Sequence, residues 1–301
     1  MISENKSREA LTDKTTRRQD DKTDAALRAF VSSCETPAPV WQQYRSALYC
    51  GDCLPMLCAM PGGVFDAVIA DPPYNSGGLT VSDRRKSVSK KYVIDGVKTV
   101  RPEFSGDSRD QRSFTLWATL WLSECLRATR EGGHLMVFSD WRQLPAMSDA
   151  IQAAGWGWRG IMAWDKTEGV RPAMGWFRAQ CEYVLCATKG AAGKEQERPV
   201  KDCVPGIWRG CRKAEDKLHI TGKPVPLIGH LMRVIAPGSL ILDPFAGSGS
   251  TILAALEHGS DCIGIDLSPE YCAIARGRLA TSPRQPSTVS TLSTLSTLPR
   301  T

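Results

Sequence analysis

Short apolar runs alternate with amphipathic segments through most of the chain. Runs of strand length lie at 46–49, 67–70, 134–138, 159–164, 182–187, 240–243 and 262–266. Apolar positions at helical spacing cover 111–130, 144–154, 226–235, 250–258 and 269–279. Strands and helices in alternation predict an α/β fold, with a mostly parallel sheet covered by helices on both faces.

The two ends of the chain do not follow this pattern. Residues 1–38 mix both charge signs without hydrophobic periodicity, and we expect a disordered polar arm there. Residues 282–301 form a low-complexity tail rich in Ser, Thr and Pro, a composition that does not build a packed core. The pattern therefore predicts one folded domain over residues 39–281.

One predicted helix carries several large apolar side chains. Phe114, Trp117, Trp121 and Cys125 recur at helical spacing within 111–130. We interpret this face as core packing rather than as a set of rings that stack on a ligand.

The composition is that of an ordinary globular protein, with 42% hydrophobic and 23% charged residues. No apolar run approaches the roughly 20 residues of a membrane helix, and the N-terminus lacks the apolar centre of a secretory signal. We therefore expect no membrane partner and a cytoplasmic location.

The 11 cysteines are odd in number and scattered, which favours reduced thiols over a disulfide framework. Cys50, Cys53 and Cys58 have the spacing of a partial zinc site. No second Cys or His pair at ligand spacing completes it, so the sequence predicts no bound metal.

The formal charge of +6 comes mainly from two stretches. Residues 84–101 carry seven basic side chains and one acid, and residues 189–217 carry eight basic side chains and five acids. Basic blocks of this kind suit a polyanion such as nucleic acid. Either block by itself is equally compatible with a solvated loop.

The predicted strand that ends at residue 70 is followed by Asp71-Pro72-Pro73-Tyr74. Neither proline has a backbone N–H to donate, so the sheet stops here and the backbone is stiff. The strand thus delivers a carboxylate and an aromatic ring to the sheet edge where ligands of α/β proteins bind. A proline-rich turn with local tyrosine packing is the purely structural alternative.

A glycine-rich loop, DPFAGSG at 243–249, follows another predicted strand and opens a helix. Its glycines allow close approach of a ligand, but Ile252 replaces the third glycine of the dinucleotide fingerprint. The next strand ends at Asp266, where an acid commonly binds ribose hydroxyls. Acids beside a loop without a phosphate-binding lysine favour a nucleoside without phosphates, and S-adenosylmethionine fits. Each acid alone is also compatible with a helix cap.

With both motifs in this order, residues 47–279 resemble the β-type, circularly permuted branch of the amino-group DNA methyltransferases, which modify adenine N6 or cytosine N4. The matching segments are YCGDCLPML (49–57), DPPYN (71–75), HITGKP (219–224), DPFAGSGST (243–251) and GIDLSPEY (264–271). The resemblance implies a seven-stranded, Rossmann-like methyltransferase sheet with one antiparallel strand. Chain order would begin at the third strand of that sheet and end with the first two.

The resemblance also implies roles for individual residues. The catalytic residues would be Asp71, Pro72, Pro73 and Tyr74. The residues that bind S-adenosylmethionine would be Asp52, Cys53, Thr221, Lys223, Pro224, Asp243, Phe245, Gly247, Gly249, Ser250 and Asp266. In this assignment Asp52 approaches the cofactor adenine, Lys223 the methionine end and Asp266 the ribose.

An exocyclic amine is a poor nucleophile, because its lone pair is delocalised into the ring. The Asp71 carboxylate and the Pro72 carbonyl can accept its two N–H groups, while Tyr74 stacks on a base swung out of the duplex. Methylation of cytosine C5 needs a Pro-Cys nucleophile, and no cysteine here follows a proline. Asp71, where serine is commoner in N4 enzymes, favours adenine N6, with cytosine N4 as the alternative.

The resemblance is weakest at 80–110 and 190–217, which contain the basic stretches, and we expect these insertions to recognise double-stranded DNA. The candidate DNA contacts are Arg84, Arg85, Lys86, Lys90, Lys91, Arg209 and Arg212. A homodimer is expected from family likeness alone. Two other classes stay open: a nicotinamide-dependent oxidoreductase, opposed by the missing third glycine, and a non-catalytic DNA-binding protein, opposed by the retained acids.

Overall fold

The computed structural model describes residues 25–26, 37–74, 110–170, 172, 174–191, 203–211 and 222–281, and every structural statement below concerns these residues. Their strands form one sheet with the order β1-β2-β9-β8-β3-β4-β6-β5-β7. In chain order the strands are β1 (Trp41–Gln43), β2 (Ser46–Cys50), β3 (Phe65–Ala70), β4 (Thr129–Ser139), β5 (Gly157–Asp165), β6 (Cys181–Thr188), β7 (Ile207–Arg209), β8 (Leu240–Asp243) and β9 (Asp261–Asp266).

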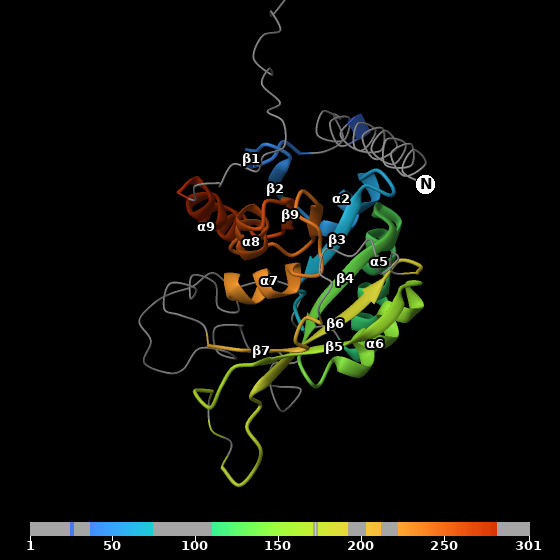
Figure 1. Ribbon diagram of the computed structural model, residues 1–301. Helices are drawn as coiled ribbons and strands as arrows, with labels where there is room; N and C mark the ends of the chain where they lie inside the picture. Colours follow the sequence, from blue (N-terminus) through green and yellow to red (C-terminus); the bar gives the residue numbers. More distant parts are fainter. Residues whose placement is uncertain are drawn as a thin grey trace, which may run out of the picture.

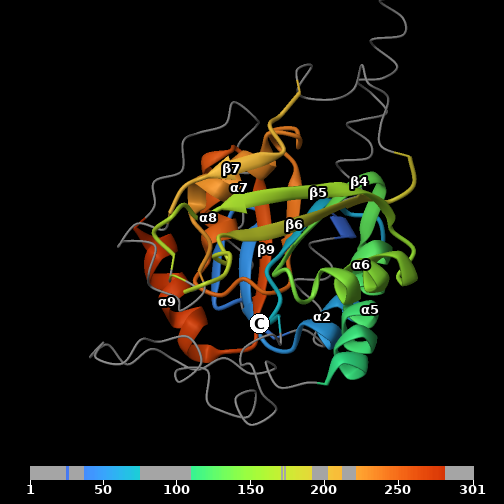
Figure 2. The same cartoon turned by 90° about the horizontal axis from the view of Figure 1, so that it is seen from below.

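Helices cover both faces of this sheet, as the alternating pattern predicts. The helices are α2 (Cys53–Ala59), α5 (Gln111–Ala128), α6 (Leu144–Ala153), α7 (Val225–Met232), α8 (Ser250–Glu257) and α9 (Pro269–Ala280). Figures 1 and 2 show α2, α5 and α6 on one face and α7, α8 and α9 on the other. The predicted α/β class is confirmed.

Strand direction follows the permuted order expected from the sequence. Strands β2, β9, β8, β3 and β4 are parallel neighbours, and β6 runs antiparallel to both β4 and β5. Within the seven predicted strands, β6 is therefore the single antiparallel one. Of the seven predicted strands, β2 comes first in the chain, and the two strands that come last, β8 and β9, lie between β2 and β3 in the sheet.

The described sheet has nine strands rather than the seven expected. The two additional strands, β1 and β7, are the edge strands and have three residues each. A strand this short has too few residues for a period-two pattern, so periodicity leaves no signal for it. β7 also places residues 207–209 of the second predicted insertion in the sheet.

Each face of the sheet has its own buried core. Successive residues of β3 alternate between them, with Val68 and Ala70 facing α2, α5 and α6, and Ala67 and Ile69 facing the other helices. This is the period of two that a strand buried on both faces requires. The face of α5 predicted to pack in the core does so, with Phe114, Trp121 and Cys125 inaccessible to solvent and Trp117 half-buried.

The short helix α2 is absent from the sequence-based prediction. Pro55 lies in its first turn, where a missing N–H costs nothing, and the Asp52 side chain accepts a hydrogen bond from Leu54 N at 3.0 Å. Asp52 is thus the N-cap that begins the helix, the signal by which it could have been found.

Several sequence-based expectations fall outside the described residues. They include nearly all of the arm at 1–38, the tail at 282–301, almost all of 80–110 and most of 190–217. Within the described part of the chain, no helix is both long and apolar enough to cross a membrane.

Candidate active site

The predicted site residues gather at one edge of the sheet. Asp52, Asp71, Asp243 and Asp266 follow or end the strands β2, β3, β8 and β9 at their carboxyl ends, and these four strands are neighbours in the sheet. Backbone bonds join the loops: Gly51 N donates to Asp266 O at 2.9 Å, and Ala246 N donates to Ile265 O at 2.8 Å. Residues up to 214 positions apart in sequence are thereby brought to a single edge.

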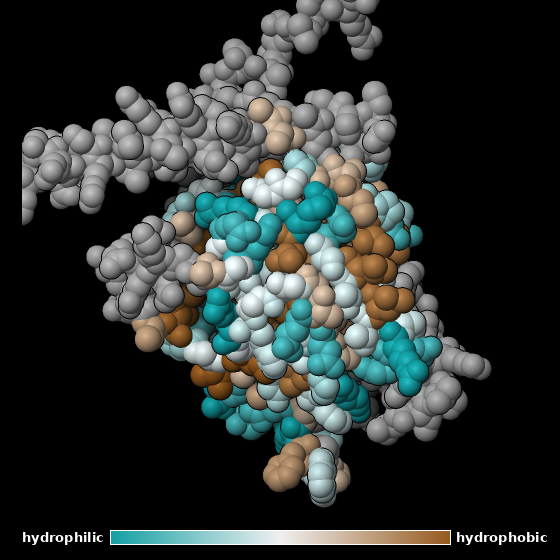
Figure 3. Space-filling model, turned by 90° about the vertical axis from the view of Figure 1, so that its right-hand side faces the viewer, coloured by the Kyte–Doolittle hydropathy of each residue, from teal (hydrophilic) through white to brown (hydrophobic). Residues whose placement is uncertain are grey.

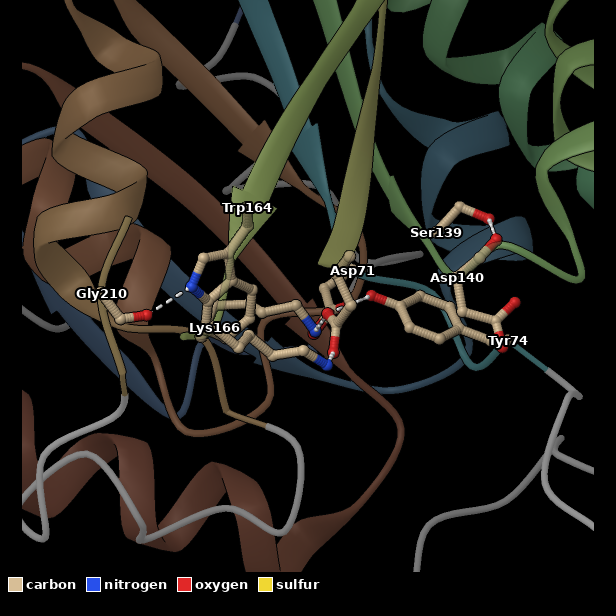
Figure 4. Close-up of polar contacts among 9 residues, drawn as sticks. Asp71, Tyr74, Ser139, Asp140, Trp164, Lys166 and Gly210 are labelled. Carbon is tan, nitrogen blue, oxygen red and sulfur yellow. Dashed lines mark hydrogen bonds and ion pairs between the residues drawn. The ribbon is translucent and has the colours of Figure 1, made fainter. Parts of the chain in front are cut away.

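Asp71 is held by two groups from different elements. Lys223 Nζ lies 2.8 Å from Asp71 Oδ2, and the Tyr74 hydroxyl donates to Asp71 Oδ1 at 2.8 Å (Figure 4). The Asp71 side chain is 23% exposed, whereas that of Lys223 is 4% exposed. Burial raises the pKa of the Asp71 carboxyl, and Lys223 opposes that rise. The contact makes Lys223 part of the Asp71 site.

Glu182, at the start of β6, is a site residue that the motifs did not reveal. It accepts from Lys166 Nζ at 2.8 Å and lies 3.3 Å from Lys223 Nζ. The Tyr74 hydroxyl also donates to Glu182, at 3.3 Å. Two lysines and two carboxylates therefore form one compact cluster. The sequence feature that could have identified Glu182 is an acid at the start of an apolar strand, in the segment EYVLCA at 182–187.

The charges of this cluster support one another. Burial would raise the pKa of Glu182, but Lys223 and Lys166 outweigh it and hold that pKa at about 2. Burial would lower the pKa of Lys223, but Asp71 and Glu182 outweigh it and raise that pKa. Glu182 and Lys223 therefore stay ionised at neutral pH.

Tyr74 lies beside this cluster with its ring toward Lys223. The ammonium of Lys223 is 5.1 Å from the Tyr74 ring centroid and 5.2 Å from that of Phe138. Burial, followed by the nearby Asp71 and Glu182, raises the pKa of the Tyr74 hydroxyl well above its ordinary value. The hydroxyl is thus a hydrogen-bond donor at neutral pH. Figure 4 shows the Tyr74 ring next to Asp140 at the end of β4.

The glycine-rich loop runs between a buried acid, Asp243, and a half-buried one, Asp266. Asp243 is 2% exposed and accepts from Phe245 N at 2.9 Å; burial raises the pKa of its carboxyl to about 7. Asp266 accepts from Gly247 N at 2.7 Å and from Ser268 N at 2.9 Å, and burial raises its pKa as well. Asp71 and Asp266 both add to the rise at Asp243, so the three acids lie within electrostatic reach of one another.

Two glycines are required by the shape of this loop. Gly249, the N-cap of α8, has φ 81°, and a Cβ there would lie 3.2 Å from Ala275 Cβ. A Cβ on Gly264 of β9 would lie 2.8 Å from Ile252 Cδ1. Arg278 of α9 holds the loop from behind, donating to Ser248 O at 2.7 Å and to Ser250 Oγ at 3.3 Å. Ser250 thus contacts α9.

The aromatic face of α5 supports the loop at Phe245. The Phe245 ring centroid lies 5.1 Å from that of Trp121, in an edge-on arrangement, and 5.6 Å from that of Trp117. The core helix therefore sets the position of a residue assigned to cofactor binding.

The remaining predicted residues divide into three groups. Cys53 is buried in α2, Pro224 is the N-cap residue of α7, and Pro72 is buried directly after Asp71. Thr221 lies outside the described residues, as do Arg84, Arg85, Lys86, Lys90, Lys91 and Arg212. Arg209 is described in β7: its Nη2 lies 2.9 Å from Glu168 Oε1 and its Nε 3.5 Å from Asp165 Oδ2. A contact with a phosphate would compete with these two acids.

The cysteines of the described residues are all free thiols. Four of them are buried, at 53, 125, 262 and 272, and three are exposed, at 58, 203 and 211. Within the same residues, no group of three His, Cys, Asp or Glu side chains is arranged to hold a metal ion.

The arrangement fits a cationic nucleoside better than a dinucleotide. A dinucleotide site uses a third glycine for close approach of the pyrophosphate, and here Ile252 takes that position while the strand before the loop ends in the Asp243 carboxyl. Ribose hydroxyls can instead donate to Asp266, and a sulfonium ligand is attracted by all three acids. The residues present therefore suit S-adenosylmethionine.

Comparison with known proteins agrees with this chemistry. Residues 65–277 match the N6_N4_Mtase family model, described as DNA methylase. YubD of Escherichia coli (strain K12), a protein named as a methylase, is 29% identical over 78% of this chain and 90% of its own. The type II methyltransferase M.ScaI of Streptomyces caespitosus is 25% identical over 80% of this chain and 83% of its own.

Solved structures share the fold at lower identity. TTHA0409 of Thermus thermophilus, named as a DNA modification methylase and solved with S-adenosyl-L-methionine, has a TM-score of 0.54 at 20% identity, over 77% of this chain and 94% of its own. The cytosine-N4-specific PvuII DNA methyltransferase has a TM-score of 0.60 at 14% identity, over 84% of this chain and 90% of its own.

Proposed function

This chain belongs to the DNA methylase family that acts on exocyclic amino groups, and from that premise we propose that it methylates adenine N6 in double-stranded DNA. The methyl donor is S-adenosylmethionine, which supplies an electrophilic methyl group on its sulfonium. The family match covers both motif regions, the Asp71 segment and the glycine-rich loop.

The observation that carries the proposal is the setting of Asp71. Its carboxylate lies at the catalytic edge of the sheet with one oxygen on Lys223 and the other on the Tyr74 hydroxyl. When the target base enters, its amino group replaces the Tyr74 hydroxyl at Asp71 Oδ1, and Lys223 keeps Oδ2. The released Tyr74 ring then stacks on the base, which must leave the duplex to reach the site.

Asp71 and Pro72 together localise the lone pair on the amine. Each accepts one N–H of the amino group, the first through its carboxylate and the second through its backbone carbonyl. The two prolines hold these acceptors in place without a conformational cost at the moment of reaction. As the new N–C bond forms, the bond between that methyl group and the sulfonium sulfur would break, and the amine would lose its proton along its hydrogen bond to the Asp71 carboxylate.

The cofactor residues act by shape and charge. We assign Asp266 to the ribose hydroxyls of the cofactor and the segment around Pro224 to its methionine end. Phe245, Gly247 and Gly249 form the surface of the loop on which the cofactor lies. The other residues assigned to the cofactor form the sheet edge on which the nucleoside would lie: Asp52, Cys53, Asp243 and Ser250. The segment before α7 adds Thr221 and Lys223.

The deciding experiment is to incubate the protein with methyl-labelled cofactor and duplex DNA and to analyse the nucleosides. Label in N6-methyladenine is the expected result. Asp71→Ala should abolish transfer, whereas Asp149→Ala, which removes an exposed acid of α6, should not change it. Full transfer by Asp71→Ala would contradict the proposed role of the motif.

Cytosine N4 is the second candidate, because the cytosine-specific PvuII enzyme shares this fold. Label confined to N4-methylcytosine would establish that alternative. A homodimer rests on family likeness alone, and light scattering of the purified protein tests it.

A further inference from the structure

The loop between β5 and β6 projects far from the body of the protein. It covers residues 166–180, described except for 171 and 173, and forms the long hairpin at the foot of Figure 1. Because β6 runs antiparallel to β5, this 166–180 hairpin leaves the sheet at the edge that carries Asp71. In Figure 3 the same end of the molecule protrudes, with tan, moderately hydrophobic atoms beside pale blue ones at its extremity.

The stem of the hairpin is braced by polar contacts. Lys166 N donates to Gln180 O at 3.0 Å, and Gln180 Nε2 donates to Asp165 Oδ1 at 2.6 Å. Arg178 reaches across the loop to the carbonyl oxygens of Glu168 and Val170. Arg209 of β7 adds an ion pair to Glu168 from the side. These contacts fix the orientation of the hairpin stem relative to the sheet.

The tip carries large apolar side chains in water. Met174, Trp176 and Phe177 are 92%, 79% and 84% exposed. Trp176 and Phe177 pack edge-on against each other, with ring centroids 5.7 Å apart, and neither belongs to the buried core clusters. A cluster of exposed apolar side chains on a braced support is typical of an interaction site.

The hairpin is continuous with the active site. Its first residue, Lys166, binds Glu182, which in turn contacts Lys223 and Tyr74. From Gln180 to Met174 the chain can span at most roughly 20 Å, about the width of a DNA duplex. A duplex placed with one base at Asp71 therefore lies within reach of the tip.

We infer that the 166–180 hairpin is a wedge that enters duplex DNA beside the target base, with Trp176 and Phe177 between the bases. An extruded base leaves an unstacked gap, and apolar side chains that fill such gaps are a known solution in proteins that distort DNA. The inference rests on the proposed function, since it requires that the substrate be a base in a duplex.

The test compares duplex with single-stranded substrate. A wedge is needed only where bases are stacked, so a Trp176→Ala/Phe177→Ala variant should lose about tenfold or more in methylation rate on plasmid duplex, the scale of one lost base-stacking contact. On the same DNA after heat denaturation, its rate should stay within about threefold of the unaltered protein. Cofactor binding, measured by calorimetry, should be unchanged.

Trp158→Ala is the matched control. Trp158 is a half-exposed tryptophan of β5, the strand that leads into the hairpin, but it lies at the end of β5 away from Asp71, and its Nε1 donates to Gly160 O. It should keep both rates. Met174→Ala is a second tip variant that leaves the two rings in place, and it should show a smaller loss confined to duplex DNA.

Three outcomes would overturn the inference. Equal losses on duplex and single strands would make the tip a general structural support. An unchanged duplex rate would remove it from the DNA interface, and conversion of a dimer to monomers would make it a contact between copies of this chain. If the unaltered protein transferred no label to DNA, the proposed function itself would fail.

Discussion

Asp71 keeps its position at the sheet edge because its charge is shared among several neighbours rather than balanced by one. Lys223 lies on both Asp71 and Glu182, and Glu182 also binds Lys166. Breaking a buried pair by removing one partner typically costs about 3–5 kcal/mol, because the remaining charge is left uncompensated. The cluster is therefore sensitive to any single substitution.

Glu182→Gln should separate positioning from binding. Without Glu182, Lys223 interacts with Asp71 alone. Its positive charge then makes the Asp71 carboxylate a weaker hydrogen-bond acceptor for the incoming amine. We expect kcat to fall about tenfold or more, since charge-assisted hydrogen bonds of this kind are worth about 1.5–3 kcal/mol, while the KM for cofactor stays unchanged. Steady-state kinetics measures both quantities. A rise in KM with kcat unchanged would contradict this role.

The same substitution has a predicted effect on stability against pH. The pKa of Glu182 is about 2 in the folded protein and 4.5 without its partners, so its stabilising contribution is present above pH 4.5 and is lost as pH falls toward 2. Thermal unfolding should show a deficit of roughly 3 kcal/mol for Glu182→Gln at pH 7 that shrinks below pH 4.5. Glu124→Gln, which removes a pair on the surface of α5 with Arg127, should cost about 1 kcal/mol or less.

The charge of Asp243 has the opposite effect on stability from that of Glu182. Its folded pKa of about 7 lies above its ordinary value of 3.8, so burying it costs more as pH rises from 3.8 to 7, by up to about 1.4 kcal/mol per pH unit. Asp243→Asn should therefore melt higher than the unaltered protein at pH 8, with an advantage that shrinks at pH 5. Cofactor affinity should fall in the same variant. Identical melting curves at both pH values would contradict the shifted pKa.

At the scale of elements, the junction of β8, the glycine-rich loop and α8 is defined by backbone conformation. Gly249 has φ 81°, in the left-handed region, and its α carbon faces Ala275 of α9. Only glycine enters this region without the cost of about 1–2 kcal/mol that a Cβ brings. The junction thus ties cofactor binding to the packing of α8 on α9.

Two glycine-to-alanine substitutions on neighbouring helices should act in opposite directions. Gly249→Ala should lower stability by about 1–2 kcal/mol through its left-handed backbone, and should weaken cofactor binding. Gly277→Ala in α9 meets no atom within 4 Å and should raise stability by about 1 kcal/mol through helix propensity. Denaturant unfolding of the two variants measures these changes. Destabilisation of both by the same amount would contradict a conformational cause.

At the scale of the whole molecule, the proposed cofactor site joins the ends of four strands, so a bound cofactor should stabilise the entire domain. At 100 times its Kd, S-adenosylmethionine should add about 2.7 kcal/mol and raise Tm by roughly 5 °C or more. NAD at the same concentration should give no shift, since Ile252 replaces the third glycine that lets a pyrophosphate approach the loop. An equal shift with NAD would contradict the assignment, and thermal fluorimetry measures both.

Much of this architecture could be predicted from the chain. All seven predicted strands and five predicted helices are present, because long apolar runs on both faces of a sheet leave clear periodic patterns. That the predicted acids and glycines lie at one edge of the sheet could be predicted, because each follows a strand end and the carboxyl ends of parallel strands meet at the same edge. β8 was predicted with its observed bounds, Leu240–Asp243.

The cluster around Glu182 could not be predicted in this way. Lys166 is an isolated lysine in the sequence, and Lys223 was assigned to the methionine end of the cofactor rather than to an ion pair with Asp71. Only the antiparallel direction of β6 brings Glu182 to the edge where β3 ends. The exposure of the hairpin tip could not be predicted either, since Trp176 and Phe177 are large apolar residues of the kind that usually lie in a core. Side-chain partners depend on strand direction, which periodicity does not report.

The reversed direction of β6 has a consequence for how the family can diversify. Parallel strands are joined by crossovers that also carry core helices, so their length is tied to packing. The 166–180 hairpin carries no core helix. A hydrogen bond from Lys166 N to Gln180 O closes its base, and none of its described residues belongs to either core. The residues between Lys166 and Gln180 can therefore vary, which would change what the enzyme touches on its substrate, while Lys166 keeps its bond to Glu182 and the register of the sheet stays fixed.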